Sequence, residues 1–324
     1  MLKANKLFLG IVIVFFILAI LSWNIEGGLF VSPPHFPKPT YSIEGNPPTS
    51  AGFKLGRKLF YESRLSADNT ISCGSCHNQF AAFTHHGHDL SHGIYDRLGK
   101  RNAPPIMNLA WNKYFMWDGG VLDLDLQPII PITDSNEMNE SLSCVLDKLK
   151  ADKEYPQLFK EAFGSTEINT EKLMKALSQF MVMLVSANAK YDSVKRQSGV
   201  VFTAEEKAGE VIFIQTCSSC HVPPLFTSDK FATNGILSQQ EVDNGRFDIT
   251  LDENDKGKFR IPSLRNVMLT APYMHDGRFR EIDDVLFHYK KKYNMSDSSI
   301  HYLKSFLHSL TDQDFINDVR FSEQ

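Results

Sequence analysis

The sequence predicts a mainly α-helical protein built from two similar halves in tandem, and three observations carry that prediction. Apolar residues recur at helical spacing, whereas the alternation typical of a half-buried strand is scarce. The motif Cys-x-x-Cys-His occurs at Cys73–His77 and again at Cys217–His221. Each copy follows a Gly-x-x-aliphatic-Phe segment and precedes a Met-x-Asp-Gly turn, and this shared order indicates a tandem duplication.

The first segment, residues 1–25, is expected to direct the chain out of the cytoplasm. An uninterrupted apolar run from Leu7 to Trp23 follows Lys3 and Lys6, as in a signal peptide or a membrane anchor. The run is longer than a usual signal core and no clear cleavage site follows it, which favours an uncleaved anchor. We therefore expect the remainder on the periplasmic or extracytoplasmic face of a bacterial inner membrane, either anchored or exported.

Residues 26–50 read as an extended linker, because proline breaks helices and central strands. The prolines of this linker are Pro33, Pro34, Pro37, Pro39, Pro47 and Pro48. A first helical domain is expected over residues 51–195 and a second over 196–315, where Thr203 and Glu206 form a capping box. The net charge of −4 and the dispersed basic residues give no footprint for nucleic acid.

Each domain is expected to close with an amphipathic helix that buries one apolar face. The apolar positions are Leu173, Leu177, Phe180, Met181 and Leu184 in the first domain, and Leu303, Phe306, Leu307 and Leu310 in the second.

The two Cys-x-x-Cys-His motifs have the spacing for covalent attachment of c-type haem. The thiols would add across haem vinyl groups and the histidine would ligate the iron from the proximal side. Redox and zinc alternatives need a βαβ context or four grouped ligands, and neither is present in the sequence. We therefore expect two covalently bound haems, held by Cys73, Cys76, His77, Cys217, Cys220 and His221. The fifth cysteine, Cys144, is expected to be a buried core residue.

The two halves differ at positions that decide what each iron can do. An electron-carrying iron has two firm axial ligands, whereas a catalytic iron needs a position that can open. The repeat register pairs Pro131 with Tyr289. Tyrosine can ligate haem iron and proline cannot, so Tyr289 is expected to cap the second iron and leave the first open. The competing ligands for the second iron are Met274, His288 and Met295.

Polar residues of the first half have no counterpart in the second, notably Gln127 and Glu137. Cleavage of a peroxide bond needs a base and then an acid, and one carboxyl group can serve as both. Glu137 is our candidate; the alternative is a solvated glutamate ahead of a helix. Trp117, which pairs with His275, is either an electron relay between haems or a core residue. A displaceable ligand for the first iron could come from His85, His86, His88 or His92.

With these motifs in view, the chain resembles the bacterial diheme cytochrome c peroxidase family, including its MauG branch. The resemblance runs from about Leu55 to Asp312. It is carried by Leu59-Phe60, Arg64-Leu65-Ser66, Thr70-Ile71-Ser72, Arg101-Asn102-Ala103-Pro104, Trp117-Asp118-Gly119, Gln127, Pro131, Glu137-Met138, Leu264-Arg265-Asn266-Val267 and Pro272-Tyr273-Met274-His275-Asp276-Gly277.

The resemblance implies two class I cytochrome c-like haem domains, the first peroxidatic and the second accepting electrons from a small c-type cytochrome or cupredoxin. It implies that Glu137 is the acid/base, Gln127 the distal glutamine and Trp117 the tryptophan between the haems. His92 matches the histidine that leaves the peroxidatic iron on activation. The resemblance further implies a calcium ion at the domain interface, with matching positions at Asn102, Thr270 and Pro272. Dimers are usual among similar peroxidases, so the resemblance is compatible with a homodimer.

Because the sequence departs from the family pattern at two positions, we consider three functions. The common Trp-Asp-Gly-Arg ends at Gly120 here, without the arginine, and the usual methionine ligand falls at Tyr289. The first hypothesis is reduction of hydrogen peroxide to water. The second is a MauG-like oxidase that modifies a partner protein, which Tyr289 favours and His92 disfavours. The third is a membrane-tethered diheme electron carrier.

Overall fold

The computed structural model describes residues 29–235 and 243–324. The predicted N-terminal anchor or signal segment, residues 1–25, lies outside the described residues. In the part of the chain that is described, no helix combines the length and the apolar character needed to cross a membrane.

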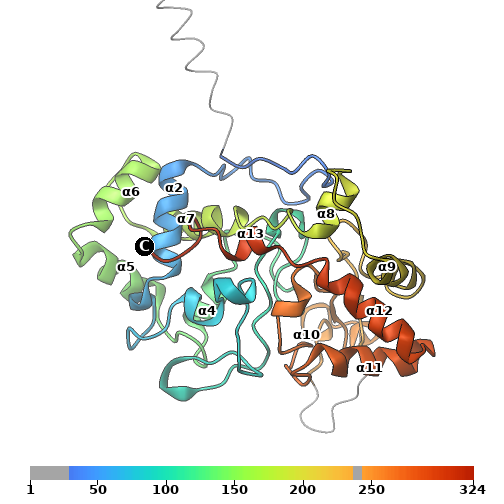
Figure 1. The fold of residues 1–324 in the computed structure, drawn as a ribbon. Coiled ribbons are helices and arrows are strands. Elements are labelled where there is room, and N and C mark those ends of the chain that lie inside the picture. Colours follow the sequence, from blue (N-terminus) through green and yellow to red (C-terminus); the bar gives the residue numbers. More distant parts are fainter. Residues whose placement is uncertain (1–28, 236–242) are drawn as a thin grey trace, which may run out of the picture.

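The described chain is mainly helical, as predicted (Figure 1). The α-helices are α2 Ser50–Phe60, α3 Cys73–Cys76, α4 Ile129–Thr133, α5 Leu142–Ala151, α6 Tyr155–Phe163, α7 Thr170–Val182, α8 Lys190–Lys195, α9 Ala204–Thr216, α10 Phe247–Thr250, α11 Ile282–Tyr293, α12 Asp297–His308 and α13 Gln313–Ile316. Short 3-10 turns lie at Ser63–Leu65, Gln79–Ala81, Ile94–Asp96, Leu109–Trp111, Glu253–Asp255 and Val267–Leu269. Two short strands, β1 Phe231–Ala232 and β2 Phe259–Arg260, pair antiparallel, with Phe231 opposite Arg260.

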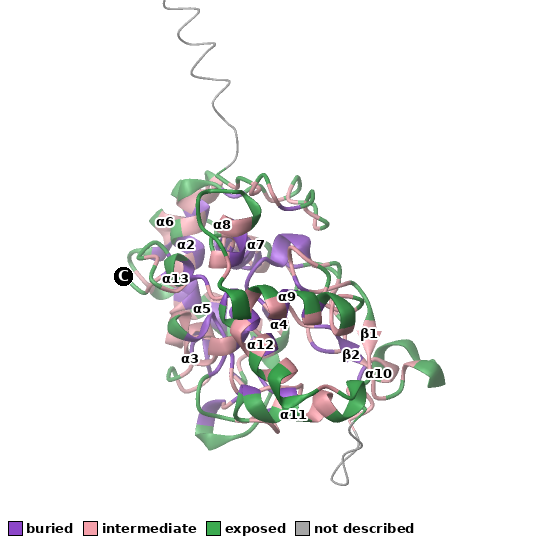
Figure 2. Cartoon of the chain, turned by 45° about the vertical axis from the view of Figure 1, so that its right-hand side comes forward, coloured by how far each residue is buried: buried purple, intermediate pink, exposed green. Residues whose placement is uncertain are grey.

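Buried apolar side chains form two separate clusters, one in each half of the chain. The first cluster joins α2, α5, α6 and α7, and the second joins α9, α11 and α12. Figure 1 shows the two groups of helices on opposite sides of the molecule. Buried residues line the inner faces of the helices, while the outer faces of α10 and α11 are exposed (Figure 2).

The helices that enter and close each half pack through a glycine. A Cβ atom on Gly56 of α2 would lie 1.9 Å from the carbonyl oxygen of Ala176 in α7. A Cβ atom on Gly209 of α9 would lie 1.9 Å from the carbonyl oxygen of Tyr302 in α12. Both glycines therefore let two backbones approach more closely than any other residue would allow.

Backbone conformation also repeats after each Cys-x-x-Cys-His motif. Asn108 and Asn266 both adopt φ of 56° and both precede a short 3-10 turn. The predicted capping box at the start of α9 is present, since Thr203 and Glu206 bond to each other's backbone nitrogen at 3.1 and 2.7 Å. The two halves thus use the same local structures at matching positions of the sequence.

The described part of the proline-rich linker, residues 29–49, contains no helix or strand, has turns at Pro33–Phe36 and Ile43–Asn46, and packs on the first half. The Trp111 indole nitrogen donates to the Pro37 carbonyl at 2.8 Å, and the Phe36 ring meets Trp111 edge-on with centroids 5.0 Å apart. At the other end of the chain, Phe315 and Phe321 also join the first apolar cluster. Aromatic side chains between the prolines explain why this segment is anchored.

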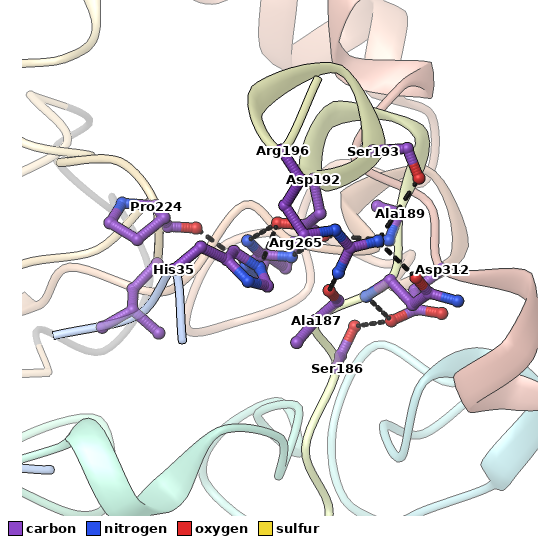
Figure 3. Close-up of polar contacts among 12 residues, drawn as sticks. His35, Ser186, Ala187, Ala189, Asp192, Ser193, Arg196, Pro224, Arg265 and Asp312 are labelled. Atoms are coloured by element: carbon purple, nitrogen blue, oxygen red, sulfur yellow. Dashed lines mark hydrogen bonds and ion pairs between the residues drawn. The ribbon is translucent and has the colours of Figure 1, made fainter. Parts of the chain in front are cut away.

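A buried ion pair joins helix α8 to the second half of the chain (Figure 3). The Arg265 guanidinium donates to both oxygens of Asp192 at 2.7 and 2.9 Å, and both side chains are fully buried. Arg265 also donates to the Pro224 carbonyl at 2.8 Å, and His35 from the linker contacts Asp192 at 3.1 Å. The linker, α8 and the second half therefore meet at one buried ion pair. Removal of either partner would leave an unpaired buried charge, which is strongly destabilising.

Replacing Gly209 with alanine is expected to lower the thermal unfolding midpoint, because the added methyl group would collide with the backbone of α12. Overpacking of this kind costs about 1–3 kcal/mol. Gly45→Ala is the control, since a Cβ atom there meets nothing within 4 Å. Equal unfolding midpoints for the two variants, measured by circular dichroism, would show that the close helix crossing does not contribute to stability.

Candidate functional site

The first Cys-x-x-Cys-His motif opens into a cavity of about 350 Å³. Its walls include Cys73, Cys76 and His77. They also include five other residues that the sequence analysis singled out, namely His92, Trp117, Gln127, Pro131 and Glu137. Residues from six separate stretches of the first half therefore meet in one cavity.

The second motif opens into a separate cavity of about 220 Å³. Cys217, Cys220 and His221 line it together with Tyr289 and Met274, the two favoured axial ligands. The other two alternatives lie outside it among the residues that the structure describes. His288 contacts the Asn234 carbonyl at 2.9 Å, and Met295 packs against the second apolar cluster. Pro131 and Tyr289 thus line matching cavities, as the repeat register predicts.

Both motif histidines are oriented for metal ligation. The Nδ1 atom of His77 lies 2.8 Å from the Phe83 carbonyl oxygen, and Nδ1 of His221 lies 3.1 Å from that of Pro262. Donation from Nδ1 leaves Nε2 as the ring nitrogen that can bind iron. Burial lowers the pKa of both imidazoles, which favours the neutral ring that ligates metals. These residues fit the proximal ligand of a haem.

The thiols of the first motif are not set up as reactive thiolates. Burial raises the pKa of Cys73 to about 12 and that of Cys76 to about 11. A redox or zinc-binding pair would need nearby positive charge to lower these values. Buried neutral sulfur is compatible with thioether bonds to a haem. Cys144, expected in the core, is exposed instead, because it lies on the outer face of α5.

Carboxyl side chains line the first cavity but not the second, among the described residues. Glu137 is half-buried, and burial raises the pKa of its carboxyl group. The Ser91 hydroxyl donates to Oε1 of Glu137 at 2.9 Å and opposes that rise. Glu137 does not stand at the start of a helix, since α5 begins five residues later, at Leu142, with its own cap, Ser141.

A tight hairpin holds Ser91 and His92 beside Glu137. The Ile94 nitrogen donates to the Glu137 carbonyl at 2.9 Å, and His92 pairs with Leu98 across the hairpin. The His92 Nε2 atom lies 3.4 Å from the Asp96 carboxylate. Of the four histidines in this run, His92 alone lines the cavity in the described structure. The imidazole is therefore near enough to the cavity to be a ligand and has an alternative partner outside it.

A thin wall separates the two cavities. Trp117 is buried in this wall, and its indole nitrogen donates to the Asn102 carbonyl at 2.8 Å. The Asn102 nitrogen donates in turn to the His275 carbonyl at 2.7 Å, and the His275 ring stacks on Phe259 with centroids 3.6 Å apart. Trp117, Asn102, Pro105 and Arg260 line both cavities. The tryptophan therefore lies between the two cavities.

The residues proposed for calcium lie together at the second cavity. Asn102, Thr270 and Pro272 all line it. The Asn102 side-chain amide donates to the Asp89 carbonyl at 3.1 Å. The described residues contain no cluster of three or more histidine, cysteine or acidic side chains suited to a metal ion. Any calcium here would depend on amide and carbonyl oxygens, which calcium accepts.

Other arginines replace the one missing at Gly120. In the second half Arg278 donates to the Asp276 carboxylate at 2.7 Å. In the first half the corresponding carboxylate, Asp118, receives a hydrogen bond from Arg101 at 2.5 Å. Arg246 donates to the Asp118 and Gly119 carbonyls at 2.9 and 2.8 Å. The positive charge at this turn is thus supplied partly from the second half of the chain.

Two further residues that line the first cavity, Ser91 and Arg260, are not marked by any sequence pattern. The contact of Ser91 with Glu137 forms only in the folded hairpin. Arg260 belongs to none of the motifs that carry the family resemblance.

Comparison with known proteins agrees with this geometry. A family model described as di-haem cytochrome c peroxidase matches residues 50–199. The chain is 34% identical to methylamine utilization protein MauG of Methylorubrum extorquens, over 81% of this chain and 74% of that protein. It is 32% identical to cytochrome c551 peroxidase of Nitrosomonas europaea, over 74% of this chain and 73% of that protein.

Solved structures give the same assignment. A MauG-like protein associated with microbial copper homeostasis superposes with a TM-score of 0.83 at 30% identity, covering 90% of this chain and 98% of that one. The diheme peroxidase BthA from Burkholderia thailandensis shares the fold, with a TM-score of 0.74 at 20% identity over 86% of this chain and 91% of that one. The chain therefore belongs to the di-haem cytochrome c peroxidase family of oxidoreductases, which includes MauG.

Proposed function

We propose that this protein is a diheme cytochrome c peroxidase that reduces hydrogen peroxide to water with electrons from a small c-type cytochrome or cupredoxin. The observation that carries the proposal is the contrast between the two cavities. Each holds a Cys-x-x-Cys-His motif, but only the first is lined by carboxyl groups in the described structure, among them the half-buried Glu137.

Both cavities fit a haem attached in the c-type manner, in two tandem class I cytochrome c-like domains. Cys73 and Cys76 would form the thioether bonds of the first haem and His77 would be its proximal ligand. Cys217, Cys220 and His221 would do the same for the second. When bound, the first haem supplies the iron that takes up peroxide, and the second supplies a relay for electrons.

Glu137 moves the protons in this proposal. Its carboxylate takes the proton of the bound hydrogen peroxide and returns it to the oxygen that leaves as water, so that one group acts as base and then as acid. Two protons from outside the peroxide and two electrons then complete the conversion of one peroxide molecule into two waters. The burial that raises the pKa of Glu137 brings it nearer to neutrality, where such a group is most effective. Gln127, on the same cavity, would orient the bound peroxide.

His92 and Tyr289 would set the coordination of the two irons. His92 would cap the first iron at rest and leave it on activation, and its contact with Asp96 gives it a second position to occupy. Tyr289 would cap the second iron, with Met274 as the alternative on the same cavity. Trp117 would pass electrons across the wall that it occupies.

The remaining parts of the proposal concern setting and assembly. Export to the periplasm, with residues 1–25 as anchor or signal, suits c-type haem attachment. A calcium ion held at Asn102, Thr270 and Pro272 would brace the wall between the cavities. A homodimer follows from the family resemblance alone.

A MauG-like oxidase that modifies a partner protein is the second candidate function. Tyr289 on the second cavity favours it, together with the identity of 34% to MauG. His92 on the first cavity favours peroxide reduction. Peroxide-dependent oxidation of a reduced small cytochrome, without covalent change in it, supports the first function over the second.

Glu137→Gln is expected to lower kcat/KM for peroxide by about 10²–10⁴-fold, because the amide cannot accept and return the proton. The assay is the oxidation of a reduced small cytochrome c by hydrogen peroxide, with haem content checked by absorption. Glu140→Gln is the matched control, since Glu140 pairs with Lys148 at 2.8 Å and does not line the cavity. A normal rate in Glu137→Gln would remove the proposed role.

Ser91→Ala is expected to move the acid limb of the kcat/KM profile to higher pH. Glu137 must be ionised to accept the first proton, so activity falls as the pH drops through its pKa. The Ser91 hydrogen bond stabilises the carboxylate, and its removal raises that pKa further. A hydrogen bond to a charged group is worth about 1.5–3 kcal/mol, which corresponds to a rise of about one pH unit or more. Ser143→Ala, on exposed α5, should leave the profile in place, and an acid limb unmoved in Ser91→Ala would contradict the contact.

A further inference from the structure

Buried arginines in this structure differ in whether their charge is compensated. Arg265 pairs with both oxygens of Asp192. Arg101 pairs with Asp118 and also with Asp243, at 2.5 and 2.7 Å. Arg260 is only 9% exposed, yet no carboxylate of the described residues lies within 4.0 Å of its guanidinium. The charge of Asp229, beyond that distance, offsets the burial of Arg260 only in part, because burial lowers the pKa of Arg260 more than Asp229 raises it. A buried cation without a paired counter-charge is costly, so an anion is expected beside Arg260.

The hydrogen bonds of Arg260 leave most of its donors free for that anion. Its backbone nitrogen donates to the Trp117 carbonyl at 2.7 Å, which fixes β2 against the wall between the cavities. Its Nε atom donates to the Met116 carbonyl at 3.3 Å. The two terminal nitrogens have no hydrogen-bond acceptor among the described residues. The guanidinium can therefore bind carboxylate oxygens on two sides at once.

The position of Arg260 identifies the anion. Its side chain lines both cavities, next to Trp117 and Asn102. The second cavity has no acidic side chain among its described lining residues, so a carboxylate there has to come from its occupant. A haem carries two propionate carboxylates, and each cavity would hold one haem.

We propose that the Arg260 guanidinium lies between the two haems, binds one propionate from each, and raises the reduction potential of both. The inference rests on the proposed occupancy of both cavities by haem. Arg260 is a positioning residue in this role, since it acts on the irons through the propionates and the electric field. A nearby positive charge favours the ferrous state, because reduction lowers the positive charge at the iron.

Arg260→Gln tests the proposal in the full-length haem-loaded protein. Spectroelectrochemical titration would measure the midpoint potential of each haem, and resonance Raman would record the propionate bending modes. Loss of the cation is expected to disfavour reduction of each haem by about tenfold or more, which is about 59 mV for one electron. Arg280→Gln is the control, because Arg280 is an exposed arginine that pairs with Asp89 and lines neither cavity.

Arg260→Lys keeps the charge but cannot hold two carboxylates with a planar fork. In this variant the equilibrium constant for reduction of each haem is expected to stay within about threefold of its value in the protein with Arg260. The propionate bending modes are expected to shift in frequency. Should Arg260→Gln fail to accumulate with haem, the lysine variant decides: propionate modes identical to those of the unmodified protein would rule out the contact.

The outcomes separate this inference from the proposed function. Unchanged potentials of both haems in a fully loaded Arg260→Gln protein would overturn the inference and leave the peroxidase proposal intact. A fall in midpoint potential at only one haem would contradict the contact of Arg260 with a propionate of each haem. An unmodified protein with fewer than two haems, or without peroxide-dependent oxidation of a donor, would instead overturn the proposed function.

Discussion

The hydrogen bonds that join the two halves across the wall between the cavities are the constraint on which the rest of the structure depends. The Asn102 nitrogen bonds to the His275 carbonyl, and the Asn102 carbonyl accepts from Trp117. Trp117 and His275 occupy the same repeat position in the two halves. Because these bonds are short and buried, they fix one cavity against the other with a single aromatic layer between them. Electron transfer between two centres needs that fixed proximity.

The two halves share local backbone features around their Cys-x-x-Cys-His motifs, and a few side chains make the two cavities different. The glycine at each helix crossing and the asparagine before each 3-10 turn keep the backbones alike. Pro131 lines one cavity and Tyr289 the other, so the first site has no ligand where the second has a phenol. Glu137 lines the first cavity, whereas no acidic residue lines the second among the described residues. Under the proposed function, these local differences would make one cavity the substrate site and the other the electron relay.

The sequence predicts the features that depend on short-range patterns, and misses those that depend on contacts between distant segments. Motif spacing identifies the cysteines and histidines of both cavities, and helical periodicity places α7, α9 and α12. The contact of Ser91 with Glu137, and the exposure of Arg260 to both cavities, arise only when loops meet in the fold. The prediction of a buried Cys144 was wrong, because Cys144 lies on the exposed face of α5 although the next residue, Val145, is buried. The prolines around Phe36 predict an extended linker, and they give no indication that Phe36 packs against Trp111.

The central claim is that one of two similar metal sites can open while the other is closed. Cyanide titration of the purified full-length protein, followed by electron paramagnetic resonance in the oxidised and half-reduced states, tests it most directly. The account predicts that one equivalent of cyanide binds per chain in at least one of these states, at the site that carries Glu137, while the signal of the Tyr289 site does not change. Binding at both sites, or at neither in any oxidation state, would contradict it.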